Sequence, residues 1–386
     1  MRRAGFYLLT LLLVLVALEA ISWIAFATAL RGKQLRYRDL DTLGPTPTQA
    51  EMDAWRTWGW DRELGWLRRP DTQETVNDRD GAWSLAIDGR GARRESYAGA
   101  GGLVSAYGDS FTFGHEVADD QTWPHYLSER LGTRVDNWGQ TAWGPDQAVL
   151  RLQRNLPRER TAIVVLAIMS ENIVRLLNCY RPFLTGDLNM KMAFKPMLMF
   201  EDGNLTWLPN PLGHSDTPTD WLEALAQART IDYWYLENRE RVRPHFPYLF
   251  RLPEALAYAV RHLSPPSLYQ HPGAVARLDY VLNEFERLAG EHDFVPVVLF
   301  IPEPAELRRF TKGQSPEYQD YVATRRARTA GTSMIVLDLL EHPFEAARFN
   351  RRPFKDHPSP YGQQVIAGVL ATTLADLPAI KNRARR

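Results

Sequence analysis

Four short polar segments of the chain could together support catalysis by a serine nucleophile. They are residues 108–110, 137–144, 170–172 and 355–360. The first segment contains Ser110, whose hydroxyl needs a base to take its proton, and the last contains His357, whose imidazole could be that base. A negative charge that develops on a substrate oxygen needs N–H donors, and these loops supply them as well. Because the four segments are far apart in the sequence, only the fold can bring them into one site.

The surrounding sequence alternates continuous apolar runs with amphipathic stretches. The predicted strands cover 102–107, 161–170, 294–302 and 334–340, and the predicted helices cover 122–132, 145–156, 276–292 and 361–377. Apolar runs of this kind are typical of strands that are covered on both faces. The alternation predicts an α/β fold, a three-layer α/β/α sandwich with a mostly parallel sheet. Functional groups in such sheets collect where strands end, which is where three of the four segments lie.

The four segments resemble, in chain order, the sequence blocks of the SGNH (GDSL-type) hydrolases. The similar stretches are GDSFTFG at 108–114, NWGQTAWGPDQ at 137–147, LAIMSENI at 166–173 and DHPSPYGQQVIA at 356–367. Two further stretches, 61–70 and 87–95, are similar to motifs that precede the first block in membrane-anchored bacterial members. Four blocks in the right order make the resemblance specific, and it implies the flavodoxin-like sandwich of that family.

The resemblance also implies a role for each block. Ser110 is then the nucleophile, and its backbone N–H is the first donor to the oxyanion. The backbone N–H of Ala142 and the side-chain amide of Asn172 are the other two donors, and His357 is the base. The family has glycine where this chain has Ala142, and alanine keeps the N–H in place only if its backbone can adopt the required conformation.

The catalytic acid departs from the family pattern. The resemblance places it two or three positions before His357, and those positions hold Phe354 and Lys355. Asp356 directly precedes the histidine and is the candidate acid, while a backbone carbonyl or Asp338 could also orient the imidazole. Loss of the acid from such a triad lowers activity without abolishing it.

A long apolar segment, residues 4–30, lies near the N-terminus, and Glu19 is its only charged side chain. At about 1.5 Å per residue, the segment can cross a hydrocarbon core of roughly 30 Å. It is longer than the apolar part of a cleavable signal peptide, so we predict an uncleaved transmembrane anchor, with cleavage after Ala29 as the alternative. Glu19 is costly in lipid unless it faces a partner or an interface.

Shifts in composition divide the rest of the chain. Residues 31–95 are predicted to be a juxtamembrane connector and leader, and residues 96–386 the hydrolase-like domain. Residues 180–270 are rich in proline and aromatic residues and interrupt the alternation of strands and helices. We therefore predict that they form an insertion within the domain.

The composition excludes several classes of protein. The chain has 386 residues, of which 45% are hydrophobic, and its 46 basic residues balance its 46 acidic ones. A neutral chain lacks the excess positive charge that nucleic-acid binding needs, and its hydrophobic content is that of a folded protein. Cys179 is the only cysteine, so the chain can form neither an internal disulfide framework nor a multi-cysteine metal site. No metal and no cofactor are expected.

Together these features predict a membrane-anchored serine esterase that removes short acyl groups, acetyl above all, from an extracytoplasmic polysaccharide. The substrate is implied only by the resemblance to anchored bacterial members. One alternative is a polysaccharide O-acyltransferase with the same serine and histidine, and another is a catalytically lapsed glycan-binding or scaffold component. The expected location is the bacterial inner membrane, crossed once, with the catalytic domain outside the cytoplasm. The expected partners are an acylated glycan or other ester, the lipid bilayer around residues 4–30 and, as an open option, a membrane protein.

Overall fold

A five-stranded parallel sheet forms the centre of the globular part, in the order β11-β10-β7-β5-β6. The computed structural model describes residues 2–30, 38–42, 44–78, 81–98, 102–214, 217–261, 267–350 and 357–382. The strands of this sheet are β5 (Val104–Gly108), β6 (Val135–Asn137), β7 (Ile163–Met169), β10 (Val295–Ile301) and β11 (Ile335–Asp338). All residues of β5, β6 and β7 are buried, as expected for strands that are covered on both faces.

Helices cover both faces of the sheet. From β5 the chain moves toward one edge of the sheet, where β6 lies. It then crosses back over β5 to β7 and continues through β10 to β11 at the opposite edge. Because such crossovers are right-handed, the helices of the two runs lie on opposite faces. On one face α4 (Trp123–Leu131) packs against α14 (Pro360–Leu374), and on the other α5 (Pro145–Asn155) packs against α10 (Pro272–His292). The predicted three-layer α/β/α sandwich with a parallel sheet is confirmed.

Local sequence signals set the ends of α4. The side chain of Thr122 accepts a hydrogen bond from the N–H of His125, so it caps the first turn. Gly132 follows the last turn in a left-handed conformation, with φ of 64°, and its N–H donates to the carbonyl of Ser128. The predicted start at Thr122 and stop at Gly132 are both confirmed.

Smaller elements surround this core. Further α-helices are α2 (Gln49–Trp58), α3 (Ser110–Phe113), α6 (Arg181–Thr185), α7 (Pro218–Ile231), α8 (Tyr233–Arg239), α11 (Pro304–Phe310), α12 (Tyr318–Thr329), α13 (Ala346–Phe349) and α15 (Pro378–Lys381). Short 3-10 helices are η1 (Asp119–Gln121), η2 (Ser170–Leu177), η3 (Leu188–Met190) and η4 (Leu339–Glu341). Antiparallel hairpins pair β1 (Trp60–Asp61) with β2 (Gly65–Trp66), β3 (Gln73–Asp78) with β4 (Gly81–Ala86), and β8 (Met197–Glu201) with β9 (Asn204–Leu208).

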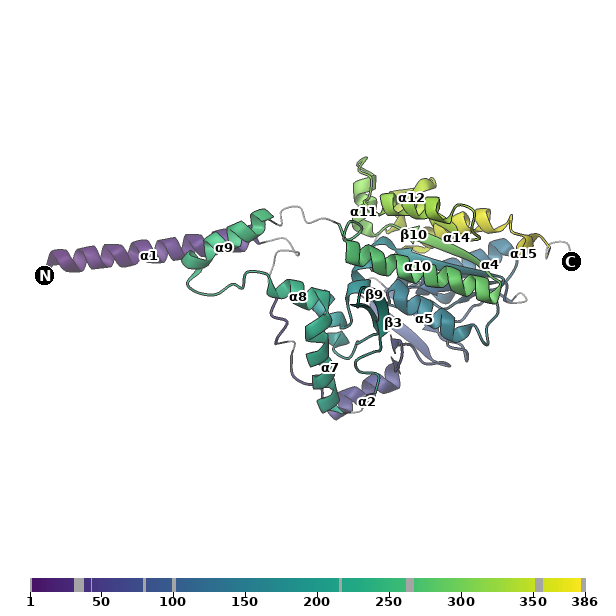
Figure 1. The fold of residues 1–386 in the computed structure, drawn as a ribbon, viewed down its shortest axis with the longest axis horizontal. Coiled ribbons are helices and arrows are strands. Elements are labelled where there is room, and N and C mark those ends of the chain that lie inside the picture. Colours follow the sequence, from purple (N-terminus) through teal and green to yellow (C-terminus); the bar gives the residue numbers. More distant parts are fainter. Residues whose placement is uncertain are drawn as a thin grey trace.

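The helix α1 (Arg2–Ala29) projects away from the globular part, and α9 (Tyr248–Arg261) lies alongside its second half (Figure 1). The stretch Arg3–Thr28 is long and apolar enough to cross a membrane, and only 6% of its apolar window is buried. Among the described residues, α1 is the one helix that meets this requirement. The helix α9 belongs to the stretch 180–270, together with α6, α7, α8 and the β8–β9 hairpin, and these elements do not join the five-stranded sheet.

Candidate active site

Ser110 lies at the carboxyl end of a central strand, where the chain turns from β5 into α3. Asp109 caps this short helix, because its carboxylate accepts a hydrogen bond from the N–H of Phe111 at 2.9 Å. The turn requires glycine at position 108, since a Cβ atom there would lie 2.5 Å from the carbonyl oxygen of Ala167 on β7. The side chain of Ser110 is thus fixed at the edge of the sheet by the packing of its own backbone.

His357 lies beside Ser110, with its Nε2 atom 3.0 Å from the serine Oγ. The histidine precedes α14, whose first turn is fixed by Ser359. The hydroxyl of Ser359 accepts a hydrogen bond from the N–H of Gly362 and donates one to the carbonyl of Arg348 at 2.7 Å. The structure therefore brings together the two residues that the sequence predicts as nucleophile and base.

A third side chain completes the arrangement, and the sequence did not predict it. The Oε2 atom of Glu116 lies 3.4 Å from the Nδ1 atom of His357, on the side of the ring that faces away from Ser110. The distance is long for a hydrogen bond, as is common for catalytic contacts in a free enzyme. Asp356, the predicted acid, lies outside the described residues. The carboxylate of Asp338 is engaged elsewhere, by the hydroxyl of Tyr318.

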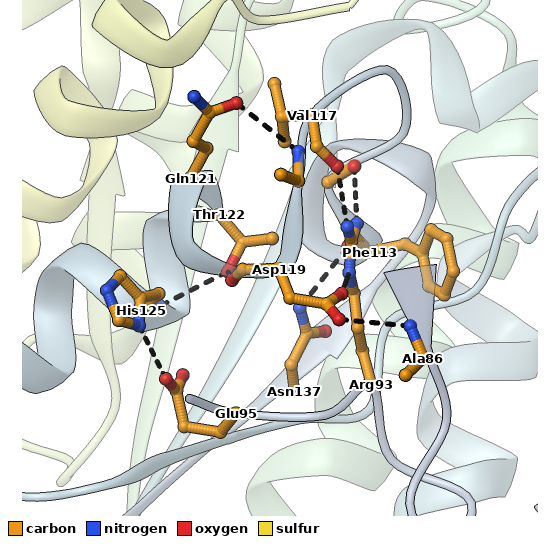
Figure 2. Close-up of polar contacts among 12 residues, drawn as sticks. Ala86, Arg93, Glu95, Phe113, Val117, Asp119, Gln121, Thr122, His125 and Asn137 are labelled. Atoms are coloured by element: carbon orange, nitrogen blue, oxygen red, sulfur yellow. Dashed lines mark hydrogen bonds and ion pairs between the residues drawn. The ribbon is translucent and has the colours of Figure 1, made fainter. Parts of the chain in front are cut away.

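The loop that carries Glu116 is held by a buried arginine. The guanidinium of Arg93 donates hydrogen bonds to the carbonyl oxygens of Phe113 and Val117, both at 2.6 Å, and to that of Gly114 (Figure 2). These carbonyls flank Glu116 on both sides. Glu116 itself has a φ of 70°, which is uncommon for a residue with a side chain. The arginine therefore fixes the loop in the conformation that points the carboxylate at the imidazole.

The backbone of the same arginine is joined to the sheet, because its N–H donates to the carbonyl of Asn137 on β6 at 2.9 Å. Asp119 forms an ion pair with Arg93 at 2.8 Å and accepts a hydrogen bond from the N–H of Ala86 at 3.0 Å (Figure 2). Burial lowers the pKa of Arg93 and raises the pKa of Asp119, and their mutual attraction opposes both shifts. The side-chain amide of Asn137, from the second block, donates to the carbonyl of Thr112 at 2.9 Å. The leader and the second block thus both support the loop after the nucleophile.

The three predicted oxyanion donors lie in two different environments. Ser110 and Ala142 line a common cavity with His357. Asn172 is 1% exposed, and its Nδ2 atom donates one hydrogen bond to Asp109 at 2.9 Å. A primary amide carries two N–H groups, so this contact uses one of them. Asp109 thereby links the serine loop to the asparagine, a contact that the sequence did not indicate.

Replacing Asn172 by alanine is expected to lower ester turnover by about 10²–10³, the scale for loss of one fixed oxyanion donor. Steady-state hydrolysis of an activated acetyl ester measures this effect. Asn189 is exposed on η3 and offers a matched control, because Asn189→Ala should leave turnover unchanged. A loss smaller than about threefold in Asn172→Ala, well below that scale, would show that Asn172 only supports packing.

Ala142 adopts a left-handed conformation, with φ of 65°, which favours glycine. Ala142→Gly is expected to keep wild-type turnover, because the site uses the backbone N–H. Ala142→Val is expected to lower turnover, toward the roughly 10²–10³-fold loss of one donor, because a β-branched residue disfavours this conformation. Thermal unfolding of both variants serves as the control for folding. Equal losses in the two variants would mean that the methyl group, and not the N–H, matters.

The cavity beside Ser110 has a volume of about 680 Å³ and a lining of both polar and apolar groups. Its charged lining residues are Glu171, Arg175, Arg181, Asp187, Glu303 and Arg308. The cavity therefore places charged groups and hydroxyl groups beside Ser110. A long apolar acyl chain in this cavity would remove several of these charged groups from water, which is costly.

His115, Glu116 and His357 could also hold a metal ion, because one ligand atom from each lies within 4.8 Å of the others. Two imidazoles and a carboxylate form a set that Zn²⁺ accepts. The Nε2 atom of His357 is already hydrogen-bonded to Ser110. An ion bound to Nδ1 of His357 would take the place of the contact between Nδ1 and Glu116. The three residues can therefore bind a metal or form a catalytic triad, but not both at once.

Comparisons with known proteins find solved structures of low sequence identity and low TM-score. No family model matches the chain, and no curated protein does. A protein from Desulfitobacterium hafniense DCB-2, described as lipolytic and of the G-D-S-L family, is 13% identical with a TM-score of 0.33, and the match covers 70% of this chain and 98% of that chain. A member of the lipolytic G-D-S-L family from Veillonella parvula DSM 2008 is 11% identical with a TM-score of 0.35, and covers 72% and 100%. The site is therefore assigned from its own geometry.

Proposed function

We propose that this protein is a membrane-anchored serine esterase that removes short acyl groups, acetyl above all, from an extracytoplasmic polysaccharide. The observation that carries the proposal is the hydrogen bond of 3.0 Å between Ser110 and His357. A serine hydroxyl is a weak nucleophile until an adjacent base takes its proton. The contact with Glu116 adds the third group that such a pair uses.

The proposed reaction has two steps. His357 takes the proton of Ser110 as the serine oxygen attacks the ester carbonyl. The resulting oxyanion accepts hydrogen bonds from N–H groups of Ser110, Ala142 and Asn172. The C–O bond to the alcohol then breaks, and the alcohol leaves with the proton from His357. Water attacks the acyl-serine by the same route in reverse and releases the carboxylic acid. Glu116 stabilises the imidazolium in both steps.

A polysaccharide O-acyltransferase is the second candidate, favoured by the polar groups that line the cavity, which could seat a sugar hydroxyl in place of water. Both reactions form the same acyl-serine and differ only in the acceptor. A catalytically lapsed binding protein would form no acyl-serine at all. Product analysis therefore separates the three possibilities.

The test incubates the full-length protein in detergent with an acetylated polysaccharide, acetyl-xylan, and measures released acetate and acetyl groups on an added unacetylated glycan. Acetate release that is absent in Ser110→Ala supports the esterase. Acetyl transfer to the added glycan without acetate release supports the transferase. If neither occurs while a small activated acetyl ester is hydrolysed, the polysaccharide substrate is wrong and the esterase chemistry stands.

The catalytic domain is expected to lie outside the cytoplasm. Arg2 and Arg3 precede the anchor, and more basic residues follow it, which by counting alone favours the opposite orientation. Long domains, however, are translocated largely regardless of such charges. Alkaline phosphatase fused after Arg386 should be active, and a fluorescent protein that folds only in the cytoplasm should be dark at the same position. The reverse pattern would overturn both the location and the glycan substrate.

A further inference from the structure

The only carboxylate within the apolar helix α1 has partners on another element. Glu19 accepts hydrogen bonds from the backbone N–H groups of Tyr248 and Leu249, the latter at 3.0 Å. These are the first two residues of α9, where the N–H groups have no partner within the helix and the helix dipole favours a negative charge. The cost of placing Glu19 in an apolar segment is therefore offset by α9.

The two helices run in parallel. The start of α9 lies at Glu19, and its last turns pack with Phe26 and Leu30 near the end of α1. Among the residues of α9 in this contact are Ala255, Tyr258 and Ala259, all buried. The helix α9 has 14 residues, or about 20 Å of length, so it covers most of the second half of α1.

The face of α9 that points away from α1 carries several large apolar side chains, beside the exposed Glu254 and Arg261. Its exposed side chains include Phe250 at 77% and Val260 at 68%, and Phe246 in the preceding loop is 72% exposed. The exposed positions 250, 253, 257 and 260 follow helical spacing and hold Phe, Pro, Ala and Val. A helix on a water-exposed surface normally carries polar residues on this face. The charged residues of α9 are Arg251, Glu254 and Arg261; Glu254 and Arg261 are exposed, and Arg251 pairs with Glu254 at 2.7 Å.

The position of Glu19 along α1 indicates how deep the start of α9 lies in the bilayer. A span of about 20 residues that begins at Ala4 ends near Trp23, an aromatic residue of the kind that marks a membrane interface. Glu19 then lies about 6 Å inside the hydrocarbon edge nearest the globular domain. Phe246 and Phe250, beside the start of α9, lie at the same depth, and the far end at Arg261 lies closer to water.

We propose that the start of α9 inserts into the leaflet nearest the globular domain, with Phe246 and Phe250 among the acyl chains of the lipids beside α1 and the rest of α9 in the interfacial region. The occupant of the exposed apolar face is thus the bilayer itself, because that face continues the lipid-facing surface of α1. Glu19 and the first turn of α9 form the polar link that holds the two helices together inside the bilayer. The inference rests on the membrane anchoring of the proposed function.

Fluorescence quenching in nanodiscs tests this insertion. Cys179 is buried and is first replaced by alanine, and single cysteines that carry an environment-sensitive fluorophore then replace Phe250, Leu12 in α1 or Leu222, an exposed leucine of α7. The full-length protein is placed at one copy per disc of phosphatidylethanolamine and phosphatidylglycerol. We expect spin-labelled lipids to quench position 250 as strongly as position 12, and aqueous iodide to quench only position 222.

Two results would overturn the proposal. Iodide quenching at position 250 equal to that at position 222 would place α9 in water, and quenching by neither agent would mean that protein covers it. In both cases, lipid quenching at position 12 would show that α1 still spans the bilayer, so that only the insertion of α9 is wrong. Glu19→Leu is further expected to speed hydrogen exchange of the Tyr248 and Leu249 amides about tenfold or more, because hydrogen bonds to a charged group are lost. Unchanged exchange would contradict the link between the helices.

Discussion

Ser110→Ala is expected to abolish both ester hydrolysis and labelling by a fluorophosphonate probe. The serine oxygen is the atom that would attack the ester, and no other hydroxyl of the described residues is hydrogen-bonded to His357. The variant should fold normally, because the cap of α3 is the side chain of Asp109. The side chain of Ser110 makes no hydrogen bond that stabilises this helix. Probe labelling followed by gel fluorescence and steady-state hydrolysis measure the two losses.

Ser315 provides the matched control for this substitution. It is exposed, and its hydroxyl donates to Gln319 far from the proposed reaction. Ser315→Ala should be labelled and should turn over ester at the wild-type rate. Wild-type turnover in Ser110→Ala would mean that another group is the nucleophile.

Glu116→Gln is expected to lower turnover by about 10²–10⁴, the range for loss of the group that orients the imidazole of a serine triad. Glutamine is similar in size, but it is neutral and cannot stabilise the imidazolium that forms when His357 takes the serine proton. The loss should fall on kcat, and fluorophosphonate labelling should slow in parallel. Glu223→Gln, at an exposed position of α7, is the control and should retain full activity.

The same experiment decides between Glu116 and the acid predicted from the sequence. If Glu116→Gln stays within about threefold of wild type while Asp356→Asn loses activity over the range expected of the acid, then Asp356 orients the histidine. If both variants lose activity, the two carboxylates share the role. Thermal unfolding of Glu116→Gln is needed beside the kinetics, because Glu116 lies in a strained backbone conformation.

Sequence patterns predicted those parts of the fold and site that depend on local structure. Continuous apolar runs marked β5, β7, β10 and β11, and caps such as Thr122 marked the ends of helices. Ser110 could be placed at the end of a predicted strand and His357 just before a predicted helix, but their pairing followed from the resemblance of the four segments, in order, to the SGNH sequence blocks.

The remaining features depend on contacts between segments that are distant in the sequence. Glu116 points at His357 because Arg93, in the leader, holds the carbonyls on both sides of it. No local pattern predicts that a loop residue will take a left-handed conformation for this reason. A signal did exist, since Glu116 lies two positions after the first block, but the candidate orienting groups were Asp356, Asp338 and a backbone carbonyl.

The helices of residues 180–270 were missed for a different reason. Proline at position 253 lies inside α9, where it normally interrupts a helix, so the stretch resembles an irregular insertion. Large apolar side chains such as Phe250 and Val260 are also exposed on α9, beside Glu254 and Arg261, which blurs the usual contrast between an apolar inner face and a polar outer face. Its partner, Glu19, lies more than two hundred positions away and offers no signal beyond being a charge in an apolar helix.

Mass spectrometry of the acyl-enzyme tests the central claim, that Ser110 is a nucleophile activated by His357, most directly. The full-length protein is mixed with an activated acetyl ester, stopped with acid before turnover is complete, and digested. We expect one acetyl group on the peptide that contains Ser110, and none on that peptide in Ser110→Ala or His357→Ala. An acetyl group on another residue, or none on the wild-type protein while ester is consumed, would contradict the account.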